Sequence, residues 1–216
     1  MCGISGIYNC SDRNINANKI IENIIKLQDK RGPDDRGMWQ STCKKTTFGH
    51  NRLSIIDLTD KARQPLVSKD NSLVITFNGE IYNYKEIRNE LSKNNILFKS
   101  NSDTEVILES YKCWGIEFVK KLRGMFAFAI WDNNKKKLLL ARDPFGIKPL
   151  YYFKKNNILF FASQVKSILS IDNLSFEKSG RSVLDYYLWG NIREPLTLYK
   201  DIYSLERGTV KIFDSK

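Results

Sequence analysis

Two strand–turn–strand patterns in the second half of the chain restrict its fold more than any other feature. MFAFAIWD (125–132) and KKLLLARD (136–143) flank the turn sequence DNNK, and PLYYFK (149–154) and ILFFAS (158–163) flank KNN. Short apolar and aromatic runs joined by Asn-containing turns are typical of β-hairpins. We therefore expect neighbouring strands in this half to pair antiparallel.

The rest of the chain adds further strands and amphipathic helices. Residues 101–115 open with the capping pattern Ser102-x-x-Glu105 and end on Gly115. Apolar spacing and turn residues predict a helix at 18–28, a loop at 30–37, strands at 3–8, 46–49, 52–57 and 73–79 (the last running into a turn), and helices at 84–94, 163–169 and 181–189. Because strands and helices do not alternate regularly, we expect one α+β domain over 1–216, with sheets stacked face to face and helices outside.

Composition narrows the class of protein. An apolar fraction of 42% is that of a folded globular chain, and the longest apolar runs, such as 125–131, are far too short to span a membrane. The N-terminus lacks the basic-then-apolar layout of a signal peptide. We therefore expect a cytoplasmic protein without a membrane partner.

The net charge of +11, from 35 basic and 24 acidic residues, has three readings. The lysines are dispersed, with only short clusters such as 135–137, and no nucleic-acid-binding motif accompanies them. This favours a solvated basic surface over nucleic-acid binding. A third reading is a basic face that docks onto an acidic partner domain.

The four cysteines stand at positions 2, 10, 43 and 113, and none forms a C-x-x-C pair. With a single histidine in the chain, no familiar zinc quartet can be completed, so we expect no metal site. Disulfides are also not expected in a reducing compartment.

Cys2 directly follows Met1, so removal of the methionine would give this cysteine a free α-amino group. An α-amine has a pKa of roughly 7.7–8.0 and lies close enough to the thiol of its own residue to act as its base. The alternative base is His50, although a lone histidine in a strand-like run is more often packed. From the residues alone, Cys2 is equally well read as a spacer at the start of a strand.

Other residues could stabilise an oxyanion or anchor the charged groups of a substrate. Asn78 and Gly79 could offer donors to an oxyanion, although Asn-Gly is also a common hairpin turn. Arg52, next to an apolar residue, could bind a carboxylate in a semi-buried position. Asp103 could meet an ammonium, although a helix cap or first-turn acid is the simpler reading, and Glu80 is either a turn residue or a second acid.

Taken in order, these stretches resemble the class II glutamine amidotransferases, and within them the glutaminase domain of glutamine-hydrolysing asparagine synthetases. The resemblance extends from residue 1 to about residue 210. Lys30, Gln164 and Arg207 depart from the family pattern, and none belongs to the expected pocket. The segments that carry the resemblance are MCGISGIY, RGPDDRG, GHNRLSIIDL, FNGEIYN, SDTEVIL, LRGMFAFAIWD, ARDPFGIKPLYY and FASQVKSIL.

The resemblance implies a four-layer αββα N-terminal nucleophile hydrolase sandwich of two largely antiparallel sheets. It also implies that Cys2 attacks the side-chain amide of L-glutamine, that ammonia leaves, and that water releases glutamate from a thioester. The implied oxyanion donors are Asn78 and Gly79. The implied substrate contacts are Arg52 with the following Leu53, Ser54, Ile55 and Ile56 for the α-carboxylate, and Glu80 and Asp103 for the α-ammonium.

The same resemblance implies a partner. Asparagine synthetases use ATP and Mg²⁺ in a further domain that carries an S-G-G-x-D-S loop, and the sequence contains no such loop. We therefore expect no cofactor in this domain, and an ATP-dependent synthetase domain or subunit as its partner; a homodimer is a further option. The acceptor of the ammonia is aspartate, or another carboxylate such as a sugar acid in polysaccharide biosynthesis.

Two other classes of function remain open at this stage. One is a regulatory or scaffold domain of the same fold that binds glutamine or a partner without catalysis. The other is nucleic-acid binding through the net charge of +11.

Overall fold

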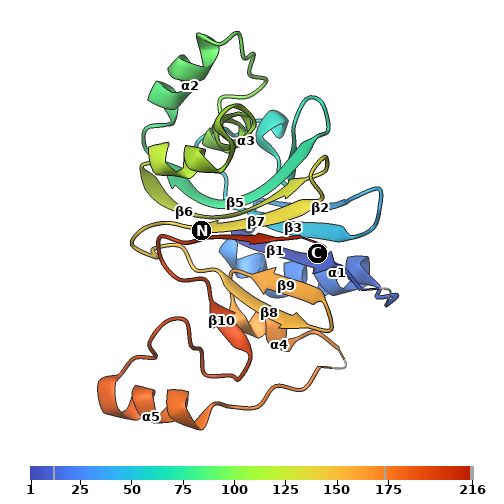
Figure 1. Ribbon diagram of the computed structural model, residues 1–216, viewed down its shortest axis with the longest axis vertical. Helices are drawn as coiled ribbons and strands as arrows, with labels where there is room; N and C mark the ends of the chain where they lie inside the picture. Colours follow the sequence, from blue (N-terminus) through green and yellow to red (C-terminus); the bar gives the residue numbers. More distant parts are fainter. Residues whose placement is uncertain (12, 173, 215–216) are drawn as a thin grey trace.

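The strands form two stacked sheets, as the computed structural model in Figure 1 shows. The structure describes residues 1–11, 13–172 and 174–214. Every strand pair in these ranges is antiparallel, as the hairpin patterns predict. The first sheet has the order β10 (Ile202–Ser204), β8 (Tyr151–Lys155), β9 (Ile158–Ala162), β1 (Gly3–Asn9), β3 (Thr46–Arg52) and β2 (Asp35–Gln40). The second has the order β11 (Val210–Phe213), β7 (Lys137–Arg142), β6 (Gly124–Asp132), β5 (Leu73–Ile81) and β4 (Leu66–Val67).

Helices cover the outer faces of the two sheets, which confirms the expected αββα sandwich (Figure 1). α1 (Ala17–Leu27) and α4 (Val165–Leu169) pack on the first sheet, while α3 (Asp103–Trp114) packs on β5 and contacts α2 (Tyr84–Ser92). α5 (Gly180–Trp189) stands apart at the lower edge of Figure 1. No helix among the described residues is long and apolar enough to cross a membrane. Short 3-10 helices are η1 (Asp29–Arg31), η2 (Asp60–Ala62) and η3 (Gly115–Lys121).

The sheets enclose a layer rich in aromatic side chains. Phe48 of β3 meets Phe161 of β9 edge-on with ring centroids 5.7 Å apart, and Tyr8 of β1 lies 5.5 Å from Trp131 of β6. Alternate residues of a strand point to opposite faces, so a strand between this layer and the helices is apolar throughout. This explains the uninterrupted run in β6, where Ala127, Ala129 and Trp131 face the other sheet and Phe126, Phe128 and Ile130 face the helices.

The caps predicted for α3 are present. The Ser102 side chain accepts a hydrogen bond from the Glu105 backbone N–H, and Gly115 ends the helix with φ of +59°. The Glu105 carboxylate accepts from the backbone N–H groups of Lys99 and Ser100, so it braces the preceding loop. The cap therefore fixes both the start of α3 and the chain that leads into it.

The expectation of separate strands at 46–49 and 52–57 is wrong. β3 runs unbroken to Arg52, and the following residues are irregular. β3 has hydrogen-bonded neighbours on both sides, and its last register partner is Asp35, opposite Arg52. Beyond that point neither neighbour continues the pairing, so the chain leaves the sheet.

The loop expected at 30–37 is also shorter than predicted. It begins with η1, and β2 already starts at Asp35, because residues 35–40 find a ladder partner in β3. Gly37 makes this pairing possible next to the 64–65 segment, since a Cβ at Gly37 would lie 1.9 Å from the Gln64 carbonyl oxygen.

We predict that the layer between the sheets has no room for a methyl group at Gly6. A Cβ there would lie 2.3 Å from Cζ of Phe161 and 2.8 Å from Cδ1 of Phe48. Overpacking of this kind typically costs about 1–3 kcal/mol, so Gly6→Ala should lower the free energy of unfolding by that amount in urea titrations.

Gly180→Ala is the matched control, because no atom lies within 4 Å of a Cβ at that position. It should leave the stability unchanged or raise it slightly. Equal effects of the two substitutions would contradict the tight packing of the sheets.

Candidate functional site

The expected site residues meet in one pocket of about 290 Å³ at the start of β1. Its wall includes Cys2, Arg52, Leu53, Ile55, Ile56, Asn78, Gly79, Glu80 and Asp103. Ser54 does not line it; its backbone N–H donates to Oδ2 of Asp34 at 2.7 Å. Residues that are far apart in the chain thus converge because the two sheets are stacked.

The Cys2 thiol is held at the pocket wall by one neighbour. Its Sγ accepts from the Leu53 backbone N–H at 3.4 Å and lies 3.6 Å from the Leu53 carbonyl oxygen. Burial raises the pKa of the thiol, and the Leu53 hydrogen bond and the charges of the amino terminus, Arg52 and Arg31 oppose that rise. The thiol is therefore protonated near neutral pH and requires a base to become nucleophilic.

His50 is not that base. It is completely buried, its Nδ1 lies 3.0 Å from Oγ1 of Thr76, and its Nε2 has no hydrogen-bond partner in the described ranges. Burial lowers the pKa of His50 to about 3, so the ring stays neutral and holds β3 against β5. Cys2 and His50 therefore do not form a catalytic pair, and the prediction that the histidine is packed in the interior is confirmed.

Asn78 and Gly79 lie inside a strand, so the hairpin-turn reading of Asn-Gly is wrong. β5 continues to Ile81, and Asn78 and Gly79 are in register with Ala127 and Phe126 of β6. The Asn78 side chain is 1% exposed, and its Nδ2 has no partner within the part of the chain that is described. Because Asn78 lines the pocket, this amide donor remains free to donate to a molecule bound there.

Arg52 shapes the loop that follows it. Its guanidinium donates to the backbone carbonyl oxygens of Asp57 and Thr59, and the residue as a whole is 7% exposed. The Asp57 carboxylate in turn accepts from the N–H and hydroxyl of Thr59 and from the Asn101 N–H, and these hydrogen bonds lower the pKa of Asp57. Arg52 therefore contributes a positive charge to the pocket wall, and its hydrogen bonds also hold the loop of that wall in place.

Asp103 joins the helix α3 to the strand that carries Asn78. Its Oδ2 accepts from the Ile81 backbone N–H at 3.0 Å. The cap of the helix is Ser102, so Asp103 is not the cap but a first-turn acid of α3, which confirms the second form of the simpler reading. Burial raises the pKa of Asp103 to about 6, with a contribution from the charge of Glu80, while backbone hydrogen bonds lower it. Two acidic side chains thus face the same space.

Two residues that support the site were not expected from the sequence: Arg31, which lies outside the pocket wall, and Gln64, which lines it. Nε of Arg31 donates to the Cys2 carbonyl oxygen at 3.0 Å and fixes the backbone of the cysteine. Gln64 accepts from the Phe77 N–H at 2.6 Å and supports β5 from the side of the pocket. Arg31 is the first residue of the segment RGPDDRG, which contributes to the family resemblance. The spacing of that segment does not reveal which backbone atom the guanidinium contacts.

A larger hollow of about 760 Å³ lies beside α5, lined in part by Tyr186, Arg193 and Arg207. It contains none of the expected site residues. The described residues also contain no group of His, Cys, Asp and Glu side chains able to hold a metal ion. The pocket at Cys2 is therefore the candidate functional site.

Comparisons with known proteins agree with this geometry. Residues 1–216 match the family model described as a glutamine amidotransferase domain. Asparagine synthetase [glutamine-hydrolyzing] 1 of Bacillus subtilis is 40% identical over 97% of this chain and 33% of its own length. A putative asparagine synthetase [glutamine-hydrolyzing] 2 of Methanocaldococcus jannaschii is 34% identical over 99% of this chain and 44% of its own. The chain thus spans between a third and a half of these relatives.

Solved structures share the fold at low sequence identity. Glutamine phosphoribosylpyrophosphate amidotransferase from B. subtilis matches all of this chain and 49% of its own with a TM-score of 0.67 and 18% identity. A structure titled as the allosteric regulatory enzyme of purine biosynthesis matches 99% of this chain and 47% of its own with a TM-score of 0.71 and 20% identity.

The raised pKa of Asp103 predicts that this residue lowers stability above about pH 6. A folded-state pKa of about 6 against an ordinary value of 3.8 favours the protonated form in the folded state, so stability is lost as the pH rises through this window. Asp103→Asn should therefore raise the free energy of unfolding by up to about 3 kcal/mol at pH 7.5 and by little at pH 4. Urea titrations at both pH values measure this.

Asp57→Asn should change the free energy of unfolding in the opposite direction, because the pKa of Asp57 is lowered. Its loss of stability should be present at pH 7.5 and shrink as the pH falls below the ordinary carboxyl range. A pH-independent effect of Asp103→Asn would contradict the burial of this carboxyl.

Proposed function

The chain belongs to the glutamine amidotransferase domain family, and on that premise we propose that its pocket hydrolyses the side-chain amide of L-glutamine to glutamate and ammonia. The observation that carries this proposal is the convergence of a thiol, an unpartnered amide donor, a buried arginine and two carboxylates on one pocket. Each group has a counterpart on glutamine: an electrophilic amide carbon, its oxygen, an α-carboxylate and an α-ammonium.

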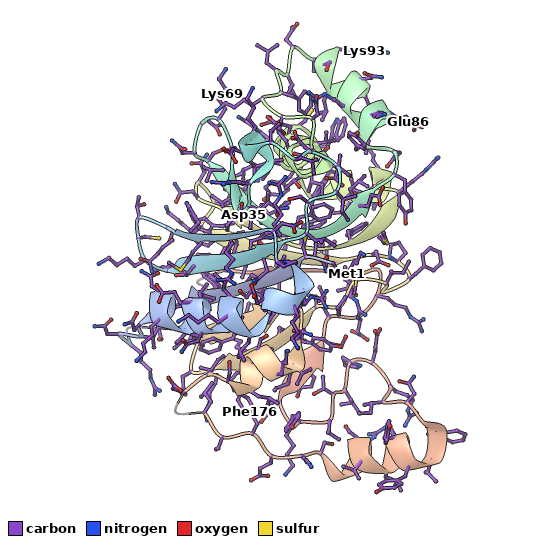
Figure 2. All side chains as sticks on the ribbon, turned by 180° about the vertical axis from the view of Figure 1, so that it is seen from behind. Met1, Asp35, Lys69, Glu86, Lys93 and Phe176 are labelled. Atoms are coloured by element: carbon purple, nitrogen blue, oxygen red, sulfur yellow. The ribbon has the colours of Figure 1, made fainter. Side chains whose placement is uncertain are left out.

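The proposed nucleophile is Cys2, activated by its own α-amine after Met1 is removed. The thiol needs a base because its pKa is raised by burial, and His50 does not supply one. A free α-amine has a pKa near neutrality and lies on the same residue as the thiol. Met1 lies where the two sheets meet (Figure 2) and lines the pocket, so its removal would also enlarge the space for substrate.

The proposed reaction passes through a thioester. The sulfur attacks the amide carbon, and the negative charge on oxygen is stabilised by the Asn78 amide and the Gly79 backbone N–H. The thiol proton, carried by the α-amine, is transferred to the nitrogen, which leaves as ammonia. Water then attacks the γ-glutamyl thioester, releases glutamate and restores the thiol. Every step uses groups that line the pocket.

The proposed substrate contacts follow the charge of the zwitterion. Arg52 and the 53–56 segment would bind the α-carboxylate, with Ser54 acting only through its backbone or loop position because its residue does not line the pocket. Asp103 and Glu80 would bind the α-ammonium. The ammonium would stabilise the ionised form of Asp103, whose pKa is raised to about 6 in the free pocket.

We further propose that the ammonia serves an ATP-dependent amidation in a synthetase domain or subunit, with aspartate as the acceptor. The names and lengths of the bacterial and archaeal relatives support this proposal. A second candidate acceptor is another carboxylate. The names of the relatives do not all refer to asparagine, since one from Gibberella zeae that is 36% identical over 96% of this chain is named amidase chry2. No metal or nucleotide is required in the glutaminase step, and a cytoplasmic location belongs to the same proposal.

The decisive experiment is glutamate release from glutamine by a chain whose intact mass shows that Met1 has been removed. Cys2→Ala should abolish release, because the sulfur forms the thioester. Insertion of one alanine between Met1 and Cys2 should reduce release at least about 100-fold, since it keeps the thiol but places the free amine on another residue. A processed wild-type chain that releases no glutamate, with or without a synthetase partner, would overturn the proposal.

Asn78→Ala should lower kcat for glutamine hydrolysis by about 10²–10³-fold with little change in KM, because the oxyanion exists only during reaction. Initial rates over a range of glutamine concentrations measure both constants. A raised KM with unchanged kcat would assign Asn78 to ground-state binding instead of the oxyanion.

A further inference from the structure

Lys148 is a buried lysine in the same pocket as Cys2, and the reaction described above gives it no role. It is 6% exposed and forms part of the pocket wall. Across the described ranges, its ammonium forms no salt bridge and no hydrogen bond. The ammonium nitrogen itself is not fully enclosed, so the stem of the side chain is packed in the wall while its charged end keeps access to open space.

The backbone of Lys148 is held by two buried charges. Its N–H donates to Oδ2 of Asp143 at 3.0 Å, and its carbonyl oxygen accepts from Nε of Arg142 at 2.8 Å. Both residues are themselves buried, and the Asp143 carboxylate also accepts from the N–H groups of Phe145 and Ile147. The loop that presents Lys148 is therefore fixed at several points, which distinguishes it from a mobile surface lysine.

The strand order places β8, the strand that follows Lys148, on the side of β1 opposite to Arg52. In the first sheet β9 and β8 lie on one side of β1, and β3 lies on the other. Arg52 ends β3, whereas Lys148 lies three residues before the start of β8. The Asp143 carboxylate that holds Lys148 also accepts from the Phe126 N–H, and Phe126 is the register partner of Gly79.

This arrangement matches one cation to each end of a bound glutamine. Arg52 already donates to two loop carbonyl oxygens and would receive the α-carboxylate. With that end of the substrate at Arg52, its side-chain amide would lie at Cys2, in the pocket that Lys148 also lines. The pocket carboxylates of Glu80 and Asp103 make no ion pair with Lys148, so they remain available to the α-ammonium.

Negative charge appears at that end only during the reaction. When sulfur bonds to the amide carbon, the carbonyl π electrons move to oxygen. They return as the carbon–nitrogen bond breaks, and nitrogen leaves as ammonia with the proton that the thiol lost. Attack of water on the thioester creates a second oxyanion, which returns its electrons as the carbon–sulfur bond breaks.

We propose that the Lys148 ammonium contacts the amide end of glutamine and stabilises these two oxyanions together with Asn78 and Gly79. This assignment rests on the proposed glutaminase function of the pocket. A fixed positive charge that faces developing negative charge in a water-poor site lowers the barrier more than it strengthens substrate binding.

The test uses three variants of the full chain. Lys148→Met keeps the length of the side chain and removes its charge, Lys148→Arg keeps the charge, and Lys154→Met removes an exposed lysine elsewhere. In glutamine hydrolysis, Lys148→Met should lower kcat by about 10-fold or more with KM changed by less than about 3-fold. Lys148→Arg should retain most of kcat, and Lys154→Met should match the wild type.

A second readout needs no turnover and reports the charge beside the thiol. The alkylation rates of Cys2 by anionic iodoacetate and by neutral iodoacetamide are compared by mass spectrometry of the N-terminal peptide. Lys148→Met should lower the iodoacetate-to-iodoacetamide rate ratio about 5-fold, and Lys148→Arg should preserve it, because a nearby cation attracts only the charged reagent.

Each outcome decides between the assignments. Unchanged kcat and unchanged alkylation ratio in Lys148→Met would overturn the role of Lys148, as would a raised KM alone or an equal loss in Lys148→Arg. An inactive wild-type chain would overturn the glutaminase function, while the alkylation ratio would still decide the position of the charge. If thermal unfolding shows that Lys148→Met does not fold, Lys148→Gln is measured in the same two assays.

Discussion

The stacking of the two sheets across an aromatic layer sets the geometry on which the pocket depends. Cys2 lies one residue before β1 in the first sheet, and Asn78 lies near the end of β5 in the second. Face-to-face sheets pack about 10 Å apart, and side chains from both fill the space between them. Where the aromatic layer ends, at the start of β1, the same spacing leaves room for a substrate-sized cavity instead of core side chains.

Burial at and around the pocket also decides the electrostatic character of the site. The same loss of solvent raises the pKa of Cys2 and Asp103 and lowers that of His50. It keeps the thiol protonated until a base acts, it makes a carboxylate ready to accept an ammonium, and it removes the histidine from acid–base chemistry. Such groups oppose folding, so the surrounding core must be stable enough to hold them. The tightly packed strands on both sides of the pocket provide that stability.

The sequence predicts most of this fold because its strongest signals are local. Hairpin turns, the cap at Ser102 and the apolar spacing of α1 each depend on residues close in the chain, and the structure confirms them. The Asn78–Gly79 pair was ambiguous because its turn preference is local, whereas its strand conformation depends on β6, more than forty residues later. The end of β3 at Arg52 is likewise set by the limits of its two neighbours.

The residues that sequence reasoning missed share a different feature. Arg31 and Lys148 bear long side chains on irregular segments, and their roles depend on which buried group holds their backbone or receives their charge. Periodicity carries no information about such positions. A family resemblance aligns the segments RGPDDRG and ARDPFGIKPLYY, but only the three-dimensional arrangement shows that Arg31 holds the Cys2 backbone and that Lys148 lines the pocket of Cys2.

The proposed removal of Met1 would change two properties of the pocket in a single cleavage. While the Met1–Cys2 peptide bond is intact, the nitrogen of Cys2 is an amide without basicity, and the Met1 residue forms part of the pocket wall. Cleavage would convert this nitrogen to an amine and remove the side chain that borders the thiol. Since the Cys2 carbonyl oxygen is held by Arg31 and its sulfur by Leu53, the new amine would be generated on a residue that is already fixed in place. Activation would then require no rearrangement of either sheet.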